Sequence, residues 1–343
     1  MAELIHVPED VLRERVRAAL VTGGADADSA DACTRALLHA SRLGIDSHGV
    51  RLAAHYVAMM RAGRINPRPQ RTVRNTGAAV AMVDADNGLG HASAYAAMEL
   101  ACELAYTAGI GAVGVAHSSH FGAAGAYALA GAESGLIALA TTNTDSLVAL
   151  HGAKGPFHGT NPIAVAAPVP GQKPWLMDLA TSSIPFNRVA LARTLGDVLP
   201  QGVAADAAGA PTRDPAAADM LLALGGADFG YKGAGLAGFV TLLSAILTGG
   251  TLDHAMRPMF RTDDFTTPRN LGHFCLAIDP GRFVGRAAYD NTMTHYLAGL
   301  RAVPARAGER VLAPGDREWD TEAARARTGI PIDRETAAVL GLS

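Results

Sequence analysis

The segment from Val113 to Thr181 reads VGVAHSSHFGAAGAYALAGAESGLIALATTNTDSLVALHGAKGPFHGTNPIAVAAPVPGQKPWLMDLAT and predicts the architecture of the whole chain. Apolar runs of strand length, Ile137 to Ala140 and Ile163 to Ala167, alternate with polar clusters that favour turns. This alternation is typical of a buried sheet that carries its chemistry on the connecting loops. An ordinary α/β core whose polar loops have no function fits the same stretch about equally well.

Composition limits the class of protein. The chain has 343 residues, of which 49% are hydrophobic and 18% charged, so we expect a packed globular protein rather than a disordered one. This length exceeds what one core usually supports, which predicts a large domain with a smaller helical part. The formal net charge of −3 and the lack of a basic run argue against a nucleic-acid partner.

Several features indicate a compartment. Cys33, Cys102 and Cys275 are scattered without CxxC spacing, and we interpret them as buried thiols in a reducing environment. The residues from Met1 to His6 lack the cationic start of a signal peptide. We find no stretch of about 20 apolar residues that would span a bilayer. We therefore expect a cytoplasmic protein with no membrane partner.

Three helices are predicted near the N-terminus. Pro8 and the two acidic residues after it begin the first helix, which ends at Gly23. The second helix is expected from about Ala27 to Leu43, and the third from Val50 to about Ala62.

We divide the chain into two parts. Residues 1–75 form the helical part, and residues 301–343 are expected to pack back on it. Residues 76–300, in which strands and helices alternate, form an α/β domain. Residues 196–228 resemble a surface excursion with little regular structure.

The third helix is expected to carry reactive side chains on one face. If it begins at Ser47, then His48, Arg51 or Leu52, and Tyr56 fall at i, i+3 or i+4, and i+8. An imidazole beside a guanidinium suits the turnover of a small hydroxy or oxo acid, because one group moves a proton while the other binds a carboxylate. The alternative is that His48 only satisfies backbone groups and Arg51 is solvated.

Gly109 to Gly114 matches the GxGxxG dinucleotide pattern literally, but we reject the match. The motif needs a strand before the glycines and a helix after them, so that the helix N-terminus meets the pyrophosphate. Here a helix from about His91 to Thr107 precedes the glycines, and a strand from Ala112 to Ala116 follows. We interpret the glycines as a helix stop and a tight turn.

A second candidate centre, Ser118-Ser119-His120, lies where that strand ends. Small residues then begin another helix, so His120 would lie beside free backbone N–H groups that can hold a phosphate or carboxylate. His120 is a candidate for proton transfer, and a structural histidine is the alternative. Three other histidines lie nearby in the sequence: His117, His151 and His158. They lack the HExxH arrangement and cysteine neighbours, so we expect no metal site.

Three later segments add polar groups. Gly159-Thr160-Asn161-Pro162 is a turn before a strand. Asp178, at the end of a strand from Trp175 to Met177, would bind a ribose hydroxyl or cap the next helix. Lys232, expected before a helix from Phe239 to Leu247, would meet a phosphate as a point charge, although the GxxxxGK[ST] pattern is not met.

Together these segments resemble the malate/L-lactate dehydrogenase family that is unrelated to the Rossmann-type enzymes of the same name, and that includes ureidoglycolate and sulfolactate dehydrogenases and piperideine-2-carboxylate reductase. The motifs that carry the resemblance are Asp46-Ser47-His48-Gly49, Ser119-His120-Phe121-Gly122, Gly159-Thr160-Asn161-Pro162, Asp178-Leu179-Ala180-Thr181, Lys232-Gly233, Asn270-Leu271-Gly272 and Pro314-Gly315. The resemblance implies an α/β, three-layer, non-Rossmann fold with a mixed sheet. It also implies NAD or NADP bound by residues 76–300, and a homodimer or higher homo-oligomer.

Roles carry over by position. His120 resembles the family's proton acceptor, and Ser47 with His48 resembles a serine–histidine pair that some members use catalytically. The candidate substrate contacts are Arg51, Tyr56 and Thr160. The cofactor contacts that the resemblance implies are His120, Phe121, Gly122, Ala123, Ala124, Thr144, Asp178, Leu179, Ala180, Phe186, Asn187 and Lys232.

Two positions depart from the family's pattern. The family usually has arginine four residues after the first histidine, where this chain has Leu52, so Arg51 is the expected substitute. The imino-acid reductases place an aspartate where this chain has Arg188, which weakens a Ser–His–Asp relay. We expect an NAD(P)-dependent dehydrogenase that interconverts a small 2-hydroxy acid and its 2-oxo acid. Reduction of a cyclic or N-alkyl imino acid is the alternative, and a ligand-binding protein without catalysis is a third possibility.

Overall fold

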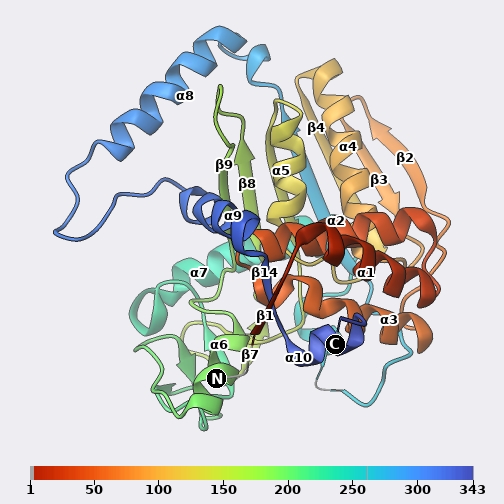
Figure 1. Cartoon of the computed structure of the whole chain (residues 1–343), viewed down its shortest axis with the longest axis vertical. Coiled ribbons are helices and arrows are strands. Elements are labelled where there is room, and N and C mark those ends of the chain that lie inside the picture. Colours follow the sequence, from red (N-terminus) through yellow and green to blue (C-terminus); the bar gives the residue numbers. More distant parts are fainter. Residues whose placement is uncertain (1–3, 261, 343) are drawn as a thin grey trace.

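The computed structural model describes residues 4–260 and 262–342, and its central layer is a seven-stranded sheet (Figure 1). The strands, in their spatial order, are β2 (Thr72–Gly77), β3 (Val80–Asp84), β4 (Ile110–Ser118), β13 (Leu271–Ile278), β5 (Ile137–Thr142), β8 (Ile163–Ala167) and β9 (Trp175–Leu179). Within this sheet β3 and β4 pair in parallel, and the other neighbours are antiparallel. The predicted mixed sheet is confirmed.

Helices cover both faces of this sheet, which gives the expected three layers. The helices are α4 (Gly90–Ala108), α5 (Gly125–Glu133), α7 (Gly226–Thr241) and the π-helical η3 (Leu242–Ile246). On one face, a Cβ on Gly111 of β4 would overlap the carbonyl oxygen of Ala101 in α4. On the other face, a Cβ on Gly272 of β13 would overlap the carbonyl oxygen of Ser244 in η3. Glycines therefore let the helices approach the sheet closely.

The N-terminal helices and the C-terminal end pack together (Figure 1). Their elements are β1 (Leu4–Val7), α1 (Glu9–Thr22), α2 (Ala27–Arg42), η1 (Asp46–His48), η2 (Val50–Leu52), α3 (Ala53–Arg61), α9 (Asp316–Thr328), β14 (Ile330–Asp333) and α10 (Arg334–Val339). β1 pairs antiparallel with β14, and Leu12, Tyr56 and Ile332 share one buried core. The division of the chain at residues 75 and 300 stays a prediction.

Two local expectations are confirmed. Gly109 ends α4 in the left-handed conformation (φ 87°) and β4 follows at once, so the GxGxxG match indeed has the wrong order of elements. The cysteines Cys33, Cys102 and Cys275 are buried free thiols.

Residues 196–228 are more regular than we expected. They contribute β10 (Ala204–Ala205), β11 (Pro211–Thr212) and β12 (Met220–Leu222) to a second sheet with β6 (Val148–Ala149) and β7 (Pro156–His158). The helix α6 (Phe186–Leu195) packs on it through Val189. Strands of two or three residues are too short to leave an alternating pattern, so the sequence did not reveal them.

The helix α7 also differs from our expectation. It begins at Gly226 rather than near Phe239, so Lys232 lies inside the helix and not in a loop before it. With η3 it forms a helix of 21 residues that contains an apolar window of 18 residues with mean hydropathy 1.3, so by length and composition alone it could cross a membrane. This corrects our statement that the chain has no such stretch. Core helices of soluble proteins meet the same criterion, and 39% of the apolar window is buried here.

The remaining elements complete the chain. They are the short helices η4 (Asp253–Ala255) and η5 (Pro280–Arg282) and the helix α8 (Arg286–Arg301). α8 extends past the end of the sheet at the upper left of Figure 1.

The close approach of β13 to η3 can be tested with a pair of substitutions. Gly272→Ala should lower the free energy of unfolding by about 1–3 kcal/mol, because the new methyl group overlaps the Ser244 carbonyl oxygen and the sheet must shift. Gly299→Ala, in the open part of α8 where a Cβ meets no atom within 4 Å, should instead stabilise by up to about 1 kcal/mol. Urea unfolding of both variants measures this, and equal stability of the two would contradict the packing described.

Candidate active site

His120 is positioned by the loop that follows β4. The Ser119 hydroxyl accepts a hydrogen bond from the Gly90 N–H at 3.0 Å and donates one to the Gly88 carbonyl at 2.8 Å. A Cβ on Gly90 would overlap the Ser119 carbonyl oxygen, so only glycine lets the start of α4 come this close. The loop is thereby held where the His120 side chain reaches the N-terminal helices.

His48 lies in η1, and the chain changes direction at Gly49. Gly49 is extended (φ −89°, ψ −157°), and a Cβ there would overlap Oγ of Ser41. The same Oγ accepts a hydrogen bond from the Val50 N–H at 3.0 Å. The expected continuous helix from Ser47 is therefore wrong, because two short 3-10 turns replace its first part. Oγ of Ser47 and Nδ1 of His48 are 2.8 Å apart, so the predicted pair is in contact.

The two histidine segments come together. The ring centroids of His48 and His120 are 5.8 Å apart, and the Tyr56 hydroxyl lies 2.7 Å from Nδ1 of His120. Tyr56 is completely buried, and its ring also meets His91 edge-on at 4.7 Å. The side chains singled out at positions 48 and 56 thus lie beside the imidazole that follows β4.

Burial keeps both imidazoles neutral at pH 7. It lowers the pKa of His48 to about 4. Burial, with smaller contributions from His48 and His91, holds the pKa of His120 well below its usual value. Burial also raises the pKa of Tyr56 well above its usual range, so the phenol keeps its proton. A neutral imidazole can act as a base, and the protonated phenol can hold it in place.

Arg51 does not join this group. It is exposed on η2, because the break at Gly49 removes it from the face that carries His48. Burial raises the pKa of Asp333, but hydrogen bonds from Thr336 and the charge of Arg51 hold it below its usual range. The charge of Arg51 therefore acts on Asp333, at the start of the C-terminal helix, rather than on the histidines.

Two other arginines face the histidines instead. A cavity of about 10 Å³, room for about one water molecule, is lined by His55, Tyr56, Met59, Arg64, Ile65, Ser119, His120 and Arg269. The charges of Arg64 and Arg269 both contribute to a lowered pKa of His55, after burial. Arg269 directly precedes the Asn270-Leu271-Gly272 motif, which was a usable signal. Nothing in the local sequence singles out Arg64.

Arg269 is already paired. It is 6% exposed, its Nη2 forms an ion pair with Asp145, and its Nε donates to the Arg257 carbonyl at 2.8 Å. Asp145 belongs to the polar cluster that follows β5, and Arg269 precedes β13. Because β5 and β13 are neighbours in the sheet, two residues 124 positions apart meet at its edge.

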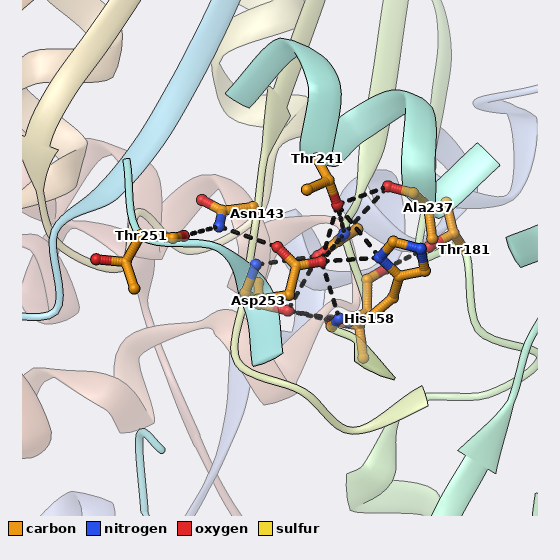
Figure 2. A network of polar contacts seen from close by, with 11 residues as sticks. Asn143, His158, Thr181, Ala237, Thr241, Thr251 and Asp253 are labelled. Carbon is orange, nitrogen blue, oxygen red and sulfur yellow. Dashed lines mark hydrogen bonds and ion pairs between the residues drawn. The ribbon is translucent and has the colours of Figure 1, made fainter. Parts of the chain in front are cut away.

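A network of buried hydrogen bonds surrounds Asp253 (Figure 2). Through Asn161 this network holds the turn that contains Thr160. Oδ2 of Asp253 accepts hydrogen bonds from Nδ2 of Asn161 at 2.7 Å and from Oγ1 of Thr241 at 2.8 Å. Oδ1 accepts one from Nδ2 of Asn143 at 3.0 Å. Burial raises the pKa of Asp253, but these hydrogen bonds, with one from His158, hold it below its usual range.

The network also positions Thr160 against Thr144. Oδ1 of Asn161 accepts a hydrogen bond from the Thr144 N–H at 3.0 Å. The Thr160 N–H donates to Oγ1 of Thr144 at 2.9 Å, and the Thr160 carbonyl accepts the Thr181 N–H at 2.8 Å. The predicted substrate contact and the predicted cofactor contact are therefore neighbours, held from one buried carboxylate.

The three histidines that lie near His120 in the sequence each contact a different partner. Nδ1 of His117 is 2.9 Å from Oδ2 of Asp84, Nδ1 of His158 is 3.1 Å from Oδ2 of Asp253, and His151 meets the Tyr231 ring. Across residues 4–260 and 262–342, no group of three His, Cys, Asp or Glu side chains is arranged to hold a metal ion.

Asp178 lies within β9 rather than after it, and it caps no helix at Thr181. Its Oδ2 accepts a hydrogen bond from the Gly125 N–H at 2.8 Å, at the start of α5. Burial raises the pKa of Asp178 to about 6. Its other oxygen has no hydrogen bond within the described part of the chain, so it can accept from a ribose hydroxyl. This donor and acceptor set fits a nicotinamide dinucleotide.

The other predicted cofactor contacts surround this carboxylate or follow it. Phe121 to Ala124 lead into α5, Leu179 and Ala180 follow Asp178 directly, and Phe186 with Asn187 begins α6. Lys232 lies on α7, where its Nζ is 5.3 Å from the centroid of the Phe229 ring. Backbone hydrogen bonds from Gly233 to Leu224 and from Leu224 to Thr181 connect α7 with the Thr160 turn.

The network in Figure 2 predicts a pH-dependent stability. Asp253→Asn should lower the free energy of unfolding by about 3 kcal/mol at pH 7, because an amide NH₂ would face buried donors. The folded pKa of Asp253 is depressed, so its contribution is present above the unfolded pKa of about 3.9 and is lost as the pH falls through the folded value. Urea unfolding should therefore show a gap between wild type and variant that shrinks below pH 4. Asp219→Asn, on the surface, is the control, and a gap independent of pH would contradict the prediction.

Known proteins resemble this chain over nearly its whole length. Residues 7–341 match the family model described as malate/L-lactate dehydrogenase. Malate dehydrogenase of Pyrococcus abyssi is 35% identical over 335 residues, covering 96% of this chain and 91% of that protein. The (2R)-3-sulfolactate dehydrogenase (NADP(+)) of Chromohalobacter salexigens is 36% identical over 328 residues, covering 94% and 92%. The crystal structure of malate dehydrogenase from Entamoeba histolytica superposes with a TM-score of 0.92 at 28% identity, covering 99% of this chain and 97% of that one. The chain belongs to the malate/L-lactate dehydrogenase family.

Proposed function

We propose that this protein is an NAD(P)-dependent oxidoreductase that interconverts a small 2-hydroxy acid and its 2-oxo acid. The observation that carries the proposal is the contact of His120 with Tyr56, beside His48 and beside a cavity lined by two buried arginines. Its relatives include proteins named malate dehydrogenase and sulfolactate dehydrogenase, and malate and sulfolactate are both 2-hydroxy acids.

In this proposal His120 exchanges the proton of the substrate hydroxyl. When bound, the nicotinamide accepts or supplies the hydride at C2. The proposal requires the tautomer in which Nδ1 of His120 carries the ring proton and donates it to the Tyr56 oxygen 2.7 Å away, in place of the long contact in which the Gly122 N–H faces Nδ1 at 3.4 Å. In that tautomer Nε2 is free to take the alcohol proton during oxidation. Tyr56 then stabilises the imidazolium that forms. In the reductive direction His120 returns that proton to the oxygen of the new alcohol. His48, oriented by Ser47, is the second choice for this role.

The same proposal assigns the remaining contacts. The guanidinium groups of Arg64 and Arg269 give the cavity the positive potential that a carboxylate needs, and they take the place that we expected for Arg51. Thr160, which the Asp253 network holds in position, contacts the substrate. NAD or NADP is held by Asp178 to Ala180 at a ribose, by the His120–Ala124 segment, and by the more distant contacts Thr144, Phe186, Asn187 and Lys232.

We further propose a homodimer in the cytoplasm. Apolar side chains on the outer surface of α7 and η3 are exposed in the single chain: Phe239, Leu242, Ile246 and Leu247. Contiguous apolar surface of this kind commonly marks a subunit interface. Light scattering of the purified protein measures the assembly, and a monomer at micromolar concentration would contradict this proposal.

Reduction of a cyclic or N-alkyl imino acid is the second candidate function. The contact between Ser47 and His48 favours it, whereas Arg188, exposed on α6, stands where those reductases place an aspartate. Pyrroline-2-carboxylate and piperideine-2-carboxylate belong in the same substrate panel as the 2-oxo acids, and faster turnover of either imine would favour this candidate.

His120→Ala tests the proton role directly. With NADH and with NADPH, against 2-oxo acids, kcat should fall by about 10²–10⁴-fold, because general acid–base catalysis is lost. NADH binding, followed by fluorescence, should weaken but persist, because His120 is only one of the proposed cofactor contacts and Asp178 to Ala180 and Phe121 to Ala124 remain. A variant that keeps full turnover on the substrate of the wild type would exclude His120 as the proton-exchange residue.

The lowered pKa of His120 predicts an unusual pH profile. A base works above its pKa. As the pH is lowered, kcat/KM for oxidation should therefore stay constant to values well below pH 6.5, where an ordinary histidine would already be protonated. A profile that declines around pH 6.5 in the wild type would show that His120 is not desolvated as described.

Tyr56→Phe should lower kcat by at least about 10-fold, with KM little changed, since Nδ1 of His120 loses its partner.

A further inference from the structure

Arg64 stands out among the side chains that line the cavity. Its residue is 2% exposed, although it follows α3 in a turn near the surface. The backbone there is anchored on both sides, because the Arg64 N–H donates to the Met59 carbonyl at 3.0 Å and the Arg64 carbonyl accepts Nδ2 of Asn87 at 2.7 Å. The guanidinium is therefore held inside the protein by the local chain path.

The hydrogen-bonding capacity of this guanidinium is largely unused. Nη2 donates to the backbone carbonyl of Asp264, and the group lies over the Phe265 ring with Cζ 5.5 Å from the ring centroid. Nε and Nη1 are buried, and neither has a hydrogen-bond partner among residues 4–260 and 262–342. Buried N–H groups without partners are costly, more so when the group is charged. Such a group is typical of a site that a ligand completes.

The charges around the cavity do not balance. Arg269 has its carboxylate in Asp145, whereas the carboxylate of Asp264 is 3.0 Å from Nη1 of Arg257. Within the described chain Arg64 has no ion pair of its own. The imidazoles and the phenol that complete the lining are neutral, so the cavity carries one positive charge in excess. One bound carboxylate neutralises that charge.

We propose that Arg64 binds the carboxylate of the 2-oxo or 2-hydroxy acid, through the guanidinium nitrogens that have no protein partner. The inference rests on the proposed function, which it deepens by naming the specificity-determining cation. Arg269, already paired with Asp145 and with the Arg257 carbonyl, supports the site by its charge and position. Arg51, exposed near Asp333, has no part in it. The site discriminates a substrate with a free carboxylate from its uncharged ester.

The test compares two Arg64 variants with a matched control. The substitutions are Arg64→Met, Arg64→Lys and Arg61→Met, the last at the exposed end of α3. Each protein is assayed with the best 2-oxo acid of the panel and with the methyl ester of that acid. Arg64→Met should lower the acid-to-ester ratio of kcat/KM by about 10–100-fold, because KM for the acid rises. Arg64→Lys should lie between, and Arg61→Met should match the wild type. An unchanged ratio in Arg64→Met would overturn the proposal.

A binding measurement separates this inference from the proposed function. Oxamate, a 2-oxo acid mimic, should raise the melting temperature of the NADH-loaded wild type and of Arg61→Met, but not of Arg64→Met. Without oxamate, Arg64→Met should melt no lower than the wild type, because an unpaired buried charge has been removed. If the wild type reduces no 2-oxo acid, the proposed function fails, and the oxamate shift still decides the role of Arg64. An equal shift in all three proteins would refute that role.

Discussion

The hydrogen bond between the Tyr56 hydroxyl and Nδ1 of His120 joins two cores, beside the contact of the Tyr56 ring with His91 of α4. Tyr56 belongs to the core of the N-terminal helices, and Phe121, next to His120, belongs to the core between α4, α5 and the sheet. Neither half contains the candidate site alone. The site exists because the chain brings a phenol from one core against an imidazole from the other, and the cavity lies along that seam.

Water exclusion at this seam determines the chemistry. It keeps the imidazoles uncharged and the phenol protonated, which prepares His120 to accept a proton at neutral pH. It also strengthens the field of each buried guanidinium. The protein balances one of these cations, Arg269, with Asp145 and leaves Arg64 unbalanced. An unbalanced buried cation lowers the stability of the free protein and prepares it for an anionic ligand.

Close backbone packing supports this arrangement from outside the cavity. Glycines at the start of α4, before η2 and in β13 let neighbouring segments approach to distances that no Cβ would allow. The sequence contains 38 glycines, a composition that permits such packing. It could not indicate which glycine breaks the helix after His48. Because of that break, the spacing of residues along one helix no longer places Arg51 on the face of His48, and the argument from spacing for Arg51 as a substrate contact no longer holds.

The sequence alone determined the mixed α/β class, the order of elements around Val113 to Thr181, the failure of the GxGxxG match and the histidine motifs, since each of these depends on local periodicity or on short motifs. Only the tertiary structure decided which cations face His120. Arg64 lies in the turn after α3, and Arg269 directly precedes β13. These segments are far apart in the chain, and no local sequence pattern predicts that they meet. The strands of residues 196–228 could not be predicted for a related reason. Strands of two or three residues are stabilised by the strands they pair with and not by their own sequence.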